Sequence, residues 1–304
     1  MTLSIIIVSY NTKKLLQDCL ESIKCSLAKD SIKAQIIIVD NNSSDGTQEY
    51  LKSIANKRGL IAIFNKDNAG FAKANNQGIE RARGKYVLLL NSDTILTEGN
   101  FFTKTIRFLE KNKKIGILGP RLLWENGQTQ PSGGYFPILP RLFTWALMID
   151  DLPLINKIIK PYHPHGPGFY TKDRYYQKPH YQDWVTGACF FIKREVIKKI
   201  GFLDENIFMY TEEMEYCYRA KKAGFDIVYY PETSLIHLGG KSGTSLLSVK
   251  NEFQGIKYFY QKHQPAWQKP IAHILLKIAA RLRKAVFCFH PEKSTVYQQV
   301  LREL

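Results

Sequence analysis

Five short apolar segments alternate with helical patterns over the first 120 residues of the chain. They are rich in β-branched side chains, have the length of strands, and lie at residues 4–8, 35–39, 60–64, 86–90 and 115–118. Between them apolar residues recur at helical spacing, as at Leu16, Leu20 and Ile23. This alternation predicts an α/β fold with a mostly parallel sheet flanked by crossover helices. Ligands bind such sheets at the carboxyl ends of the strands.

The second half of the chain has a different pattern. An Asn-Gly pair at residues 126–127 predicts a hairpin turn, and residues 131–183 are rich in Pro, Gly and aromatic side chains without a clear period. Regular pattern then predicts a strand at 184–192, helices near 193–200 and 212–223, and short strands at 226–230 and 234–238. Beyond Gly240 the pattern is helical and basic to the end.

The balance of charge and the cysteine pattern limit the class of protein. Lys and Arg number 43 against 27 Asp and Glu, and the net charge of +16 suits anionic partners such as nucleotides, nucleic acid or acidic lipids. The five cysteines never occur as C-x-x-C, which argues against a disulfide framework and a zinc site. The N-terminus lacks signal-peptide character, and no window holds about 18 uncharged apolar residues. We expect a cytoplasmic protein, either free or peripheral on the inner face of the cell membrane.

Polar turns follow the second and third predicted strands. Asp40 could accept hydrogen bonds from a base or a ribose, although the same turn could simply cap the next helix through Ser44 or Asp45. The next turn contains Asn68 and Gly70, and the glycine permits a ligand to approach the backbone closely. Asn76 lies inside the following helix at a cost in propensity, which indicates a hydrogen-bonding role. Close packing of that helix is the structural alternative.

An amide and a carboxylate follow the fourth predicted strand. Asn91 and Asp93 are two residues apart, so alternation places them on one side of the chain. Asp93 could supply an oxygen ligand to Mg²⁺ or Mn²⁺ bridging a diphosphate, while Asn91 orients the phosphates or the ribose. A plain Asn-Ser-Asp-Thr turn is the alternative.

An acidic cluster and a histidine lie further along the chain. Glu212 and Glu213 begin a predicted helix that Thr211 could cap, and the helix dipole favours the ionised carboxylate that a general base needs. The two side chains lie about 100° apart around the helix, so we expect only one to face a reaction. His237 lies in a predicted strand before two glycines and is a candidate ligand for Mn²⁺. Surface carboxylates and a structural histidine are the alternatives.

Five motifs of the chain occur in a fixed order. They are VSYN at residues 8–11, VDNNSSDGT at 39–47, NAGFAKANNQG at 68–78, NSD at 91–93, and the stretch from TGA at 186–188 through GFLD at 201–204 to TEEME at 211–215 and His237. Together they resemble the motifs of family 2 inverting glycosyltransferases, over residues 3 to about 242. The resemblance implies the GT-A fold, a Rossmann-like nucleotide-diphospho-sugar transferase fold with a mixed, mostly parallel sheet, here followed by a helical tail.

The resemblance also implies a role for each matching position. Asp40 would lie near the base and ribose, and further donor contacts would come from Ser9, Asn11, Asn68, Gly70, Asn76 and Asn91. Asp93 would bind Mn²⁺ or Mg²⁺, with His237 as a further ligand. Glu213, with Glu212 as the second candidate, would be the base in a single displacement with inversion. The chain departs from the family pattern at two positions, with Asn91 in place of Asp and Glu213 where Asp is common.

Within the family, the sequence DWVTGA at residues 183–188 and the insertion before it resemble bacterial rhamnosyltransferases. The resemblance implies dTDP-rhamnose or a UDP-sugar as donor, and a saccharide or lipid-linked saccharide as acceptor in cell-surface polysaccharide or glycolipid assembly. We expect a GT-A domain over 1–240, with a nucleotide-sugar-binding half (1–120), an acceptor-binding half (121–240) containing the insertion 131–183, and a basic helical extension over 241–304.

The extension has apolar residues at helical spacing, with basic residues between them. The apolar positions include Trp267, Ile271, Ile274, Leu275, Ile278, Leu282 and Val286. Such a helix could lie on an anionic membrane, or it could pack its apolar stripe against the catalytic domain.

Three other functions are compatible with parts of the sequence. A nucleotidyltransferase acting on sugar phosphates would use a similar core but leaves the acidic pair and His237 without a role. A nucleic-acid-binding protein is suggested by the charge of +16 alone, and because no binding motif supports it, we expect no nucleic-acid partner. A non-catalytic sugar-nucleotide binder would accommodate the departures at Asn91 and Glu213.

Overall fold

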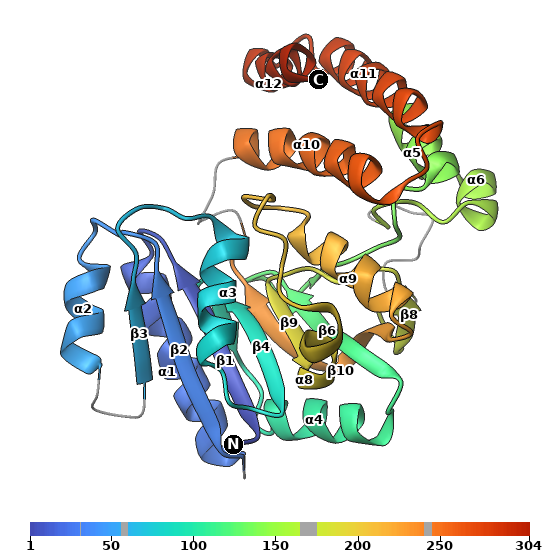
Figure 1. Ribbon diagram of the computed structural model, residues 1–304. Helices are drawn as coiled ribbons and strands as arrows, with labels where there is room; N and C mark the ends of the chain where they lie inside the picture. The colour runs from blue at the N-terminus through green and yellow to red at the C-terminus, as the bar shows by residue number, and fades with distance from the viewer. Residues whose placement is uncertain (31, 56–59, 165–174, 240–244) are drawn as a thin grey trace.

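The computed structural model describes residues 1–30, 32–55, 60–164, 175–239 and 245–304, and one mixed sheet forms its centre (Figure 1). Along the sheet the strands follow the order β3-β2-β1-β4-β9-β6-β10-β5, while β7 pairs with β6 and β8 with β10. Their bounds are β1 Leu3–Ser9, β2 Ala34–Asp40, β3 Leu60–Phe64, β4 Tyr86–Asn91, β5 Thr94–Leu96, β6 Ile115–Leu123, β7 Thr129–Gln130, β8 His180–Gln182, β9 Cys189–Lys193 and β10 Asp226–His237.

The register of the parallel strands brings their carboxyl ends together. Strand β1 runs parallel to β2 and β4, and Val8 lies opposite Val39 on one side and Asn91 on the other. Strand β9 is antiparallel to β4, with Cys189 opposite Leu90. The start of β9 therefore lies beside the end of β4, where ligands bind in sheets of this kind.

Helices cover both faces of the sheet because apolar side chains alternate along the strands. Ile5 and Ile7 point into a core shared with α1 (Lys13–Lys29), α2 (Thr47–Ile54) and α4 (Phe101–Lys111). Ile6 points into the opposite core, against α3 (Phe71–Arg81), α8 (Arg194–Ile200) and α9 (Glu212–Lys222). Each layer thus buries one side of nearly continuous apolar strands.

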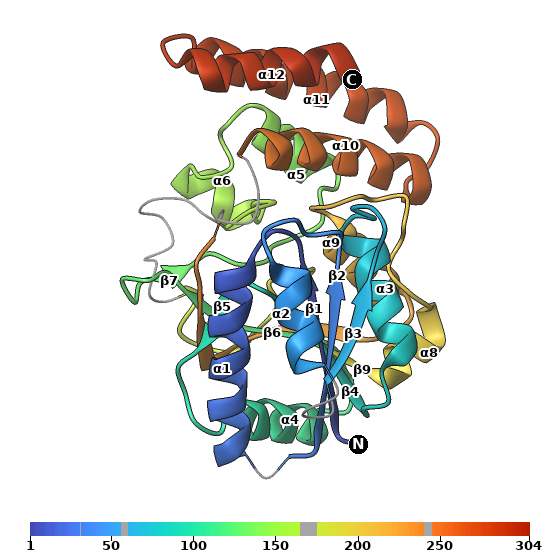
Figure 2. The ribbon, with the colours of Figure 1, turned by 90° about the vertical axis from the view of Figure 1, so that its left-hand side faces the viewer.

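A helical lobe lies beyond the carboxyl ends of β2 and β3 (Figures 1 and 2). It consists of α5 (Leu139–Ala146), α6 (Pro153–Ile158), α10 (Ser245–His263), α11 (Gln268–Val286) and α12 (Pro291–Glu303). Phe253 and Leu276 of the lobe are buried in the same apolar cluster as Met214 of α9. The lobe and the sheet domain therefore share one continuous core.

The structure confirms the predicted alternation of strands and helices and corrects the bounds of some strands. The strands predicted in the first 120 residues are present as β1 to β4 and β6, and the predicted hairpin joins β6 to β7 with Gly127 at a φ of 79°. The strand predicted at 184–192 is wrong in its first half, because the chain turns at Gly187 and Ala188 before β9 begins. The two strands predicted at 226–230 and 234–238 form one strand, β10, with an irregularity between Tyr230 and Ser234.

Candidate active site

A cavity of about 180 Å³, here called the strand-end cavity, opens where β1 and β4 end. It is bounded by the turn at Gly187 before β9 and by the start of α9. Five residues singled out from the sequence line it, namely Asn68, Asn91, Glu212, Glu213 and His237. The topology thus brings together groups that are up to 169 positions apart in the chain, from Asn68 to His237.

Asparagines form one wall of the strand-end cavity. The Nδ2 atom of Asn41 donates hydrogen bonds of 3.2 Å to Oδ1 of Asn68 and to the carbonyl oxygen of Gly70. Asn41 and Tyr10 also line the cavity, although neither was singled out from the sequence. Asn41 could have been identified, because it follows Asp40 directly at the end of β2.

Asp40, Ser9 and Asn11 lie beside the cavity and do not line it. Oδ2 of Asp40 accepts hydrogen bonds from the backbone N of Ser43 (2.9 Å) and from Nε2 of Gln48 (3.0 Å), and its buried Oδ1 has no hydrogen-bond partner among the described residues. The hydroxyls of Ser9 and Thr12 lie 2.9 Å apart. Oδ1 of Asn11 accepts a 2.7 Å hydrogen bond from the backbone N of Ser44, which holds two strand-end turns together.

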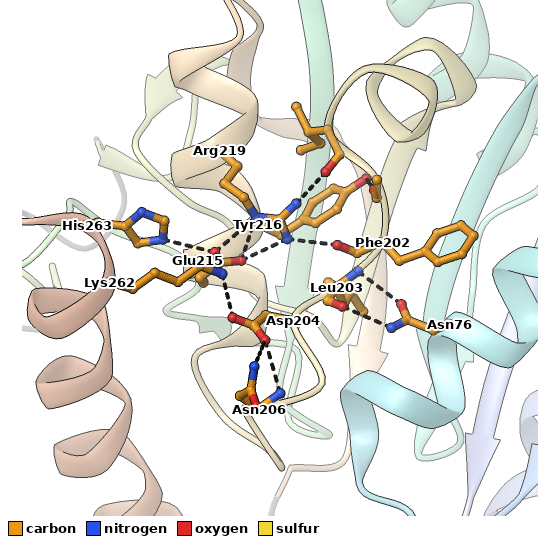
Figure 3. Close-up of polar contacts among 12 residues, drawn as sticks. Asn76, Phe202, Leu203, Asp204, Asn206, Glu215, Tyr216, Arg219, Lys262 and His263 are labelled. Atoms are coloured by element: carbon orange, nitrogen blue, oxygen red, sulfur yellow. Dashed lines mark hydrogen bonds and ion pairs between the residues drawn. The ribbon is translucent and has the colours of Figure 1, made fainter.

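Gly70 and Asn76 contact the segment before α9 instead of the cavity. A Cβ atom at Gly70 would lie 2.7 Å from the ring of Phe208, and its φ is 83°. Nδ2 of Asn76 donates to the carbonyl oxygen of Leu203 (2.9 Å) and its Oδ1 accepts from the backbone N of Leu203 (3.0 Å), as Figure 3 shows. Both residues thus hold the chain that leads into the acidic pair.

Asp93 and His237 face each other beside the strand-end cavity. Nε2 of His237 lies 3.4 Å from Oδ1 of Asp93 and 3.5 Å from Nδ2 of Asn91. Nδ1 of His237 lies 2.8 Å from Oε1 of Gln130, and because that oxygen accepts only, it fixes the ring proton on Nδ1. In the neutral ring, the lone pair of Nε2 then faces a carboxylate oxygen, an arrangement that suits a shared proton or a cation.

The protein groups alone form an incomplete metal site. Within the part of the chain that the structure describes, no cluster of three His, Cys, Asp or Glu side chains could hold an ion. Asp93 and His237 supply one oxygen and one nitrogen, and Asn91 has a buried Oδ1 without a hydrogen-bond partner among the described residues. A cation bound here would need further oxygen ligands from a substrate or from water.

The two carboxyl groups at the start of α9 have different surroundings. Burial raises the pKa of Glu212 well above its ordinary value, and repulsion from Glu213 raises it further. Burial also raises the pKa of Glu213, but hydrogen bonds from backbone groups, including Gly187, oppose that rise. Glu212 is therefore the harder of the two to ionise, which favours Glu213 as the carboxylate that takes the charge as the pH rises.

The backbone is strained just before the acidic pair. Tyr210 has a φ of 67° and Thr211 a φ of 136°, values that are unfavourable for non-glycine residues. The predicted cap by the Thr211 side chain is wrong, because that side chain makes no capping hydrogen bond. Instead Oε2 of Glu213 accepts a 3.2 Å hydrogen bond from the backbone N of Thr211, and the side chain of Thr211 packs against Gly255 of α10.

A polar cluster anchors α9 to the helical lobe (Figure 3). Glu215 is buried and accepts hydrogen bonds from Arg219 on its own helix (2.9 Å) and from Lys262 (2.8 Å) and His263 (2.9 Å) on α10. Lys262 also contacts Asp204 at 2.5 Å, in the segment that Asn76 holds. The position of the acidic pair therefore depends on the lobe.

A second cavity of about 450 Å³, here called the lobe cavity, lies between α9 and the helical lobe. Its walls include the aromatic side chains of Trp145, Tyr162, Trp184, Phe253 and Tyr297. In its lining, Nε2 of His163 lies 2.6 Å from Oε1 of Glu252. Thr186, Tyr210 and Glu213 line both cavities, so Glu213 lies where the two cavities adjoin.

Comparison with known proteins places these features in a family context. The family model described as "Glycosyl transferase family 2" matches residues 4–201. The low-salt glycan biosynthesis hexosyltransferase Agl10 of Haloferax volcanii is 26% identical over 244 residues, which cover 77% of this chain and, at 66%, just under two thirds of that enzyme. The N-acetylglucosaminyl-diphospho-decaprenol L-rhamnosyltransferase of Mycobacterium tuberculosis is 24% identical over 284 residues, covering 88% of this chain and 87% of that protein.

A solved structure supports the GT-A fold. The mannosyltransferase PcManGT from Pyrobaculum calidifontis, in complex with GDP-Man and Mn²⁺, matches with a TM-score of 0.57 and 15% sequence identity, covering 99% of this chain and 74% of that chain. At this level of identity the likeness establishes the fold alone.

Proposed function

Because the chain belongs to glycosyl transferase family 2 and has the GT-A fold of its structural neighbours, we propose that it moves a sugar from a nucleotide-diphosphate donor to an acceptor hydroxyl with inversion. The position of Glu213 on the wall common to both cavities carries this proposal. A donor in the strand-end cavity and an acceptor in the lobe cavity would meet at that carboxylate.

The strand-end cavity suits the nucleotide sugar. Asn41, Asn68 and Asn91 present amide groups that can exchange hydrogen bonds with ribose, base or phosphate oxygens. The free Oδ1 of Asp40 could accept from a base or a ribose hydroxyl, provided that the turn at the end of β2 opens to admit it. Contacts from Ser9, Asn11, Gly70 and Asn76 to the donor stay predictions.

Asp93 and His237 would hold a divalent cation, Mn²⁺ or Mg²⁺, beside the donor diphosphate. A carboxylate oxygen and an imidazole lone pair that face each other at 3.4 Å fit such an ion, and the imidazole favours Mn²⁺. The ion would supply positive charge that stabilises the departing nucleoside diphosphate. Mn²⁺ in the mannosyltransferase with the same fold supports the assignment.

Glu213 would act as the general base. Its carboxylate takes the proton of the acceptor hydroxyl while the acceptor oxygen bonds to the anomeric carbon and the bond to the diphosphate breaks. Attack on the face opposite the leaving group inverts the anomeric centre. Burial and the neighbouring Glu213 raise the pKa of Glu212, which disfavours a second negative charge near the diphosphate.

The substrate classes follow from the relatives and from the lobe cavity. We propose dTDP-rhamnose or a UDP-sugar as donor, and a saccharide or lipid-linked saccharide as acceptor in cell-surface polysaccharide or glycolipid assembly. The similarity to the mycobacterial N-acetylglucosaminyl-diphospho-decaprenol L-rhamnosyltransferase supports this choice. Aromatic rings around the lobe cavity suit the apolar face of a pyranose ring.

The proposal includes work in the cytoplasm at the inner face of the membrane, where a lipid-linked acceptor would be reached. Among the described residues, no helix is long and apolar enough to cross a bilayer. We propose that contact with the membrane is peripheral.

A donor screen tests the proposed function. The protein is incubated with dTDP-rhamnose, UDP-sugars or GDP-mannose, with and without Mn²⁺ or Mg²⁺, and released nucleoside diphosphate is measured. We expect metal-dependent release from one donor and its loss in Asp93→Ala. Failure of every donor to bind or react would refute the transferase assignment, and pyrophosphate as product would indicate nucleotidyl transfer instead.

A further inference from the structure

Helix α11 has two apolar faces. Ala272, Leu276 and Ala279 are buried in the core between the lobe helices. The opposite, outer face is apolar as well, and its side chains follow helical spacing at Trp267, Ile271, Ile274, Ile278 and Leu282. Trp267 is 62% exposed and Ile274 is 57% exposed. The two alternatives drawn from the sequence are therefore not exclusive, because packing in the lobe uses only one of the faces.

Basic side chains line one edge of the outer face. Lys277, Arg281 and Lys284 follow the same helical spacing, and at about 100° per residue they lie next to the apolar stripe. Within the described part of the chain, none of the three forms an ion pair. Residues 253–291, which include all of α11, contain no Asp or Glu.

We propose that the outer face of α11 binds the surface of an anionic lipid bilayer. The stripe from Trp267 to Leu282 would enter the boundary between headgroups and acyl chains, and the basic edge would contact lipid phosphates. A second copy of the chain is a poorer partner, because pairing two such faces would bring basic edges together without any acidic side chain on α11 to oppose them. Charge complementarity therefore selects the anionic lipid surface.

Binding of the outer face of α11 to a bilayer would place the lobe cavity close to the membrane surface. Arg283 of α11 lines the lobe cavity, while the outer face of the same helix is exposed. One helix, about 10 Å in diameter, therefore separates the lobe cavity from the proposed membrane surface. A lipid-linked acceptor could place its saccharide in the lobe cavity while its chain stays in the bilayer, a point that rests on the proposed function.

Vesicle sedimentation without any substrate tests the surface. Wild-type protein is compared on vesicles of phosphatidylcholine alone and of phosphatidylcholine mixed with phosphatidylglycerol. Two variants address the surface: Ile271→Ser with Ile274→Ser, and Lys277→Gln with Arg281→Gln and Lys284→Gln. The matched control, Lys104→Gln with Arg107→Gln and Lys111→Gln, removes the same charge from α4 at the opposite end of the molecule (Figures 1 and 2).

We expect wild type and the α4 control to bind anionic vesicles alike, and each α11 variant to bind at least about tenfold more weakly. Unchanged donor hydrolysis in the α11 variants would show that they fold. The proposal is overturned if wild type does not bind anionic vesicles, or if the α4 control loses as much binding as the α11 variants. It is also overturned if the apolar stripe forms a dimer interface, so that wild type is a dimer and the Ile variant is a monomer. Vesicle binding is measured without substrate, and sugar transfer to a soluble acceptor does not need a membrane. A failure of the membrane proposal can therefore be distinguished from a failure of the proposed function.

Discussion

Nε2 of His263 on α10 lies 2.9 Å from Oε1 of Glu215 on α9, so a hydrogen bond to a buried carboxylate joins the helix that begins with the acidic pair to the helical lobe (Figure 3). Lys262 lies next to His263 on α10 and contacts both Glu215 and Asp204. Because Glu215 is only two residues from Glu213, this contact fixes the proposed base, Glu213, relative to the lobe cavity.

Glu215→Gln should destabilise the protein by about 2 kcal/mol, because it removes the buried carboxylate that Arg219, Lys262 and His263 share, while partial exposure of Arg219 and Lys262 lets water replace part of the loss. Burial favours the protonated form of Glu215, but hydrogen bonds from His263, Arg219 and Lys262 outweigh it and lower the pKa to about 2. The stabilisation is therefore present above the ordinary pKa of 4.5 and is lost as the pH falls from there towards 2. Urea unfolding at several pH values measures the difference, which should shrink below pH 4.5. The control Glu110→Gln, in an exposed pair with Lys85, should change stability by less than about 1 kcal/mol.

Glu213→Gln should lower kcat by about 10²–10⁴ while donor binding is retained, since the amide keeps the shape but accepts no proton. In the wild type, burial raises the pKa of Glu213, so the ionised base is present above that pKa and turnover falls as the pH drops through it. Single-turnover rates across pH, with donor affinity from calorimetry, measure both effects. Glu212→Gln is the matched comparison and should keep most of the rate. A larger loss in Glu212→Gln would exchange the two roles.

Asn91→Asp should strengthen Mn²⁺ binding in the presence of nucleoside diphosphate, because it adds a carboxylate next to Asp93 and His237. We expect an increase of about tenfold, and a decrease of at least that size in Asp93→Asn. Calorimetric titration with Mn²⁺ in the presence of nucleoside diphosphate measures the affinity of each variant for the ion and does not depend on turnover. Equal Mn²⁺ affinity in wild type and Asp93→Asn would remove Asp93 from the metal site.

Gly255→Ala should destabilise the protein by about 1–3 kcal/mol, because the added Cβ would lie 2.0 Å from Oγ1 of Thr211. Thr211→Gly should restore most of the loss in the double variant, since it removes that side chain and relieves a φ of 136°. Wild type, the two single variants and the double variant form a double-mutant cycle, and urea unfolding measures the free energy of unfolding of each protein. Gly99→Ala is the control, because its Cβ would meet only the flexible end of Lys29. Additive effects of the two substitutions would show that the contact carries no strain.

Trp184→Ala should raise the KM for the acceptor several-fold and leave donor hydrolysis without acceptor unchanged, because Trp184 lines only the lobe cavity. Initial rates with acceptor varied at saturating donor, and donor hydrolysis measured alone, separate the two cavities. A rise in the KM for the donor instead would mean that the donor occupies the lobe cavity.

Much of the sheet could be predicted because its strands are apolar on both faces and have strand length. Strands β1 to β4 follow that pattern, and the residues after them meet at one edge because parallel strands share a direction. Strand β5, Thr94–Leu96, was missed because three residues have no readable period. It exists because β10 pairs with it, with His237 opposite Thr94.

The residues of the strand-end cavity were harder to predict than the strands. Asn91 and Glu213 were found because each lies at the end or the start of a regular element. Gly70 and Asn76 were expected at the donor, yet they contact Phe208 and Leu203, more than a hundred positions away in the chain. No local pattern shows which distant segment folds back against a helix. The lobe cavity was missed for the same reason, since its walls come from the insertion and from the C-terminal helices.

The two cavities that adjoin at Glu213 are built mostly from different parts of the chain, so the lining of one could change in evolution while that of the other is kept. The strand-end cavity is lined by the sheet domain, whereas much of the lobe cavity is lined by residues of the insertion and of α10, α11 and α12. On the proposed assignment of donor and acceptor to the two cavities, grafting the insertion and lobe of a relative onto this sheet domain would redirect the protein to another acceptor while the donor is retained. Such a graft would have to keep Gly255 and the partners of Glu215, because they join the two halves.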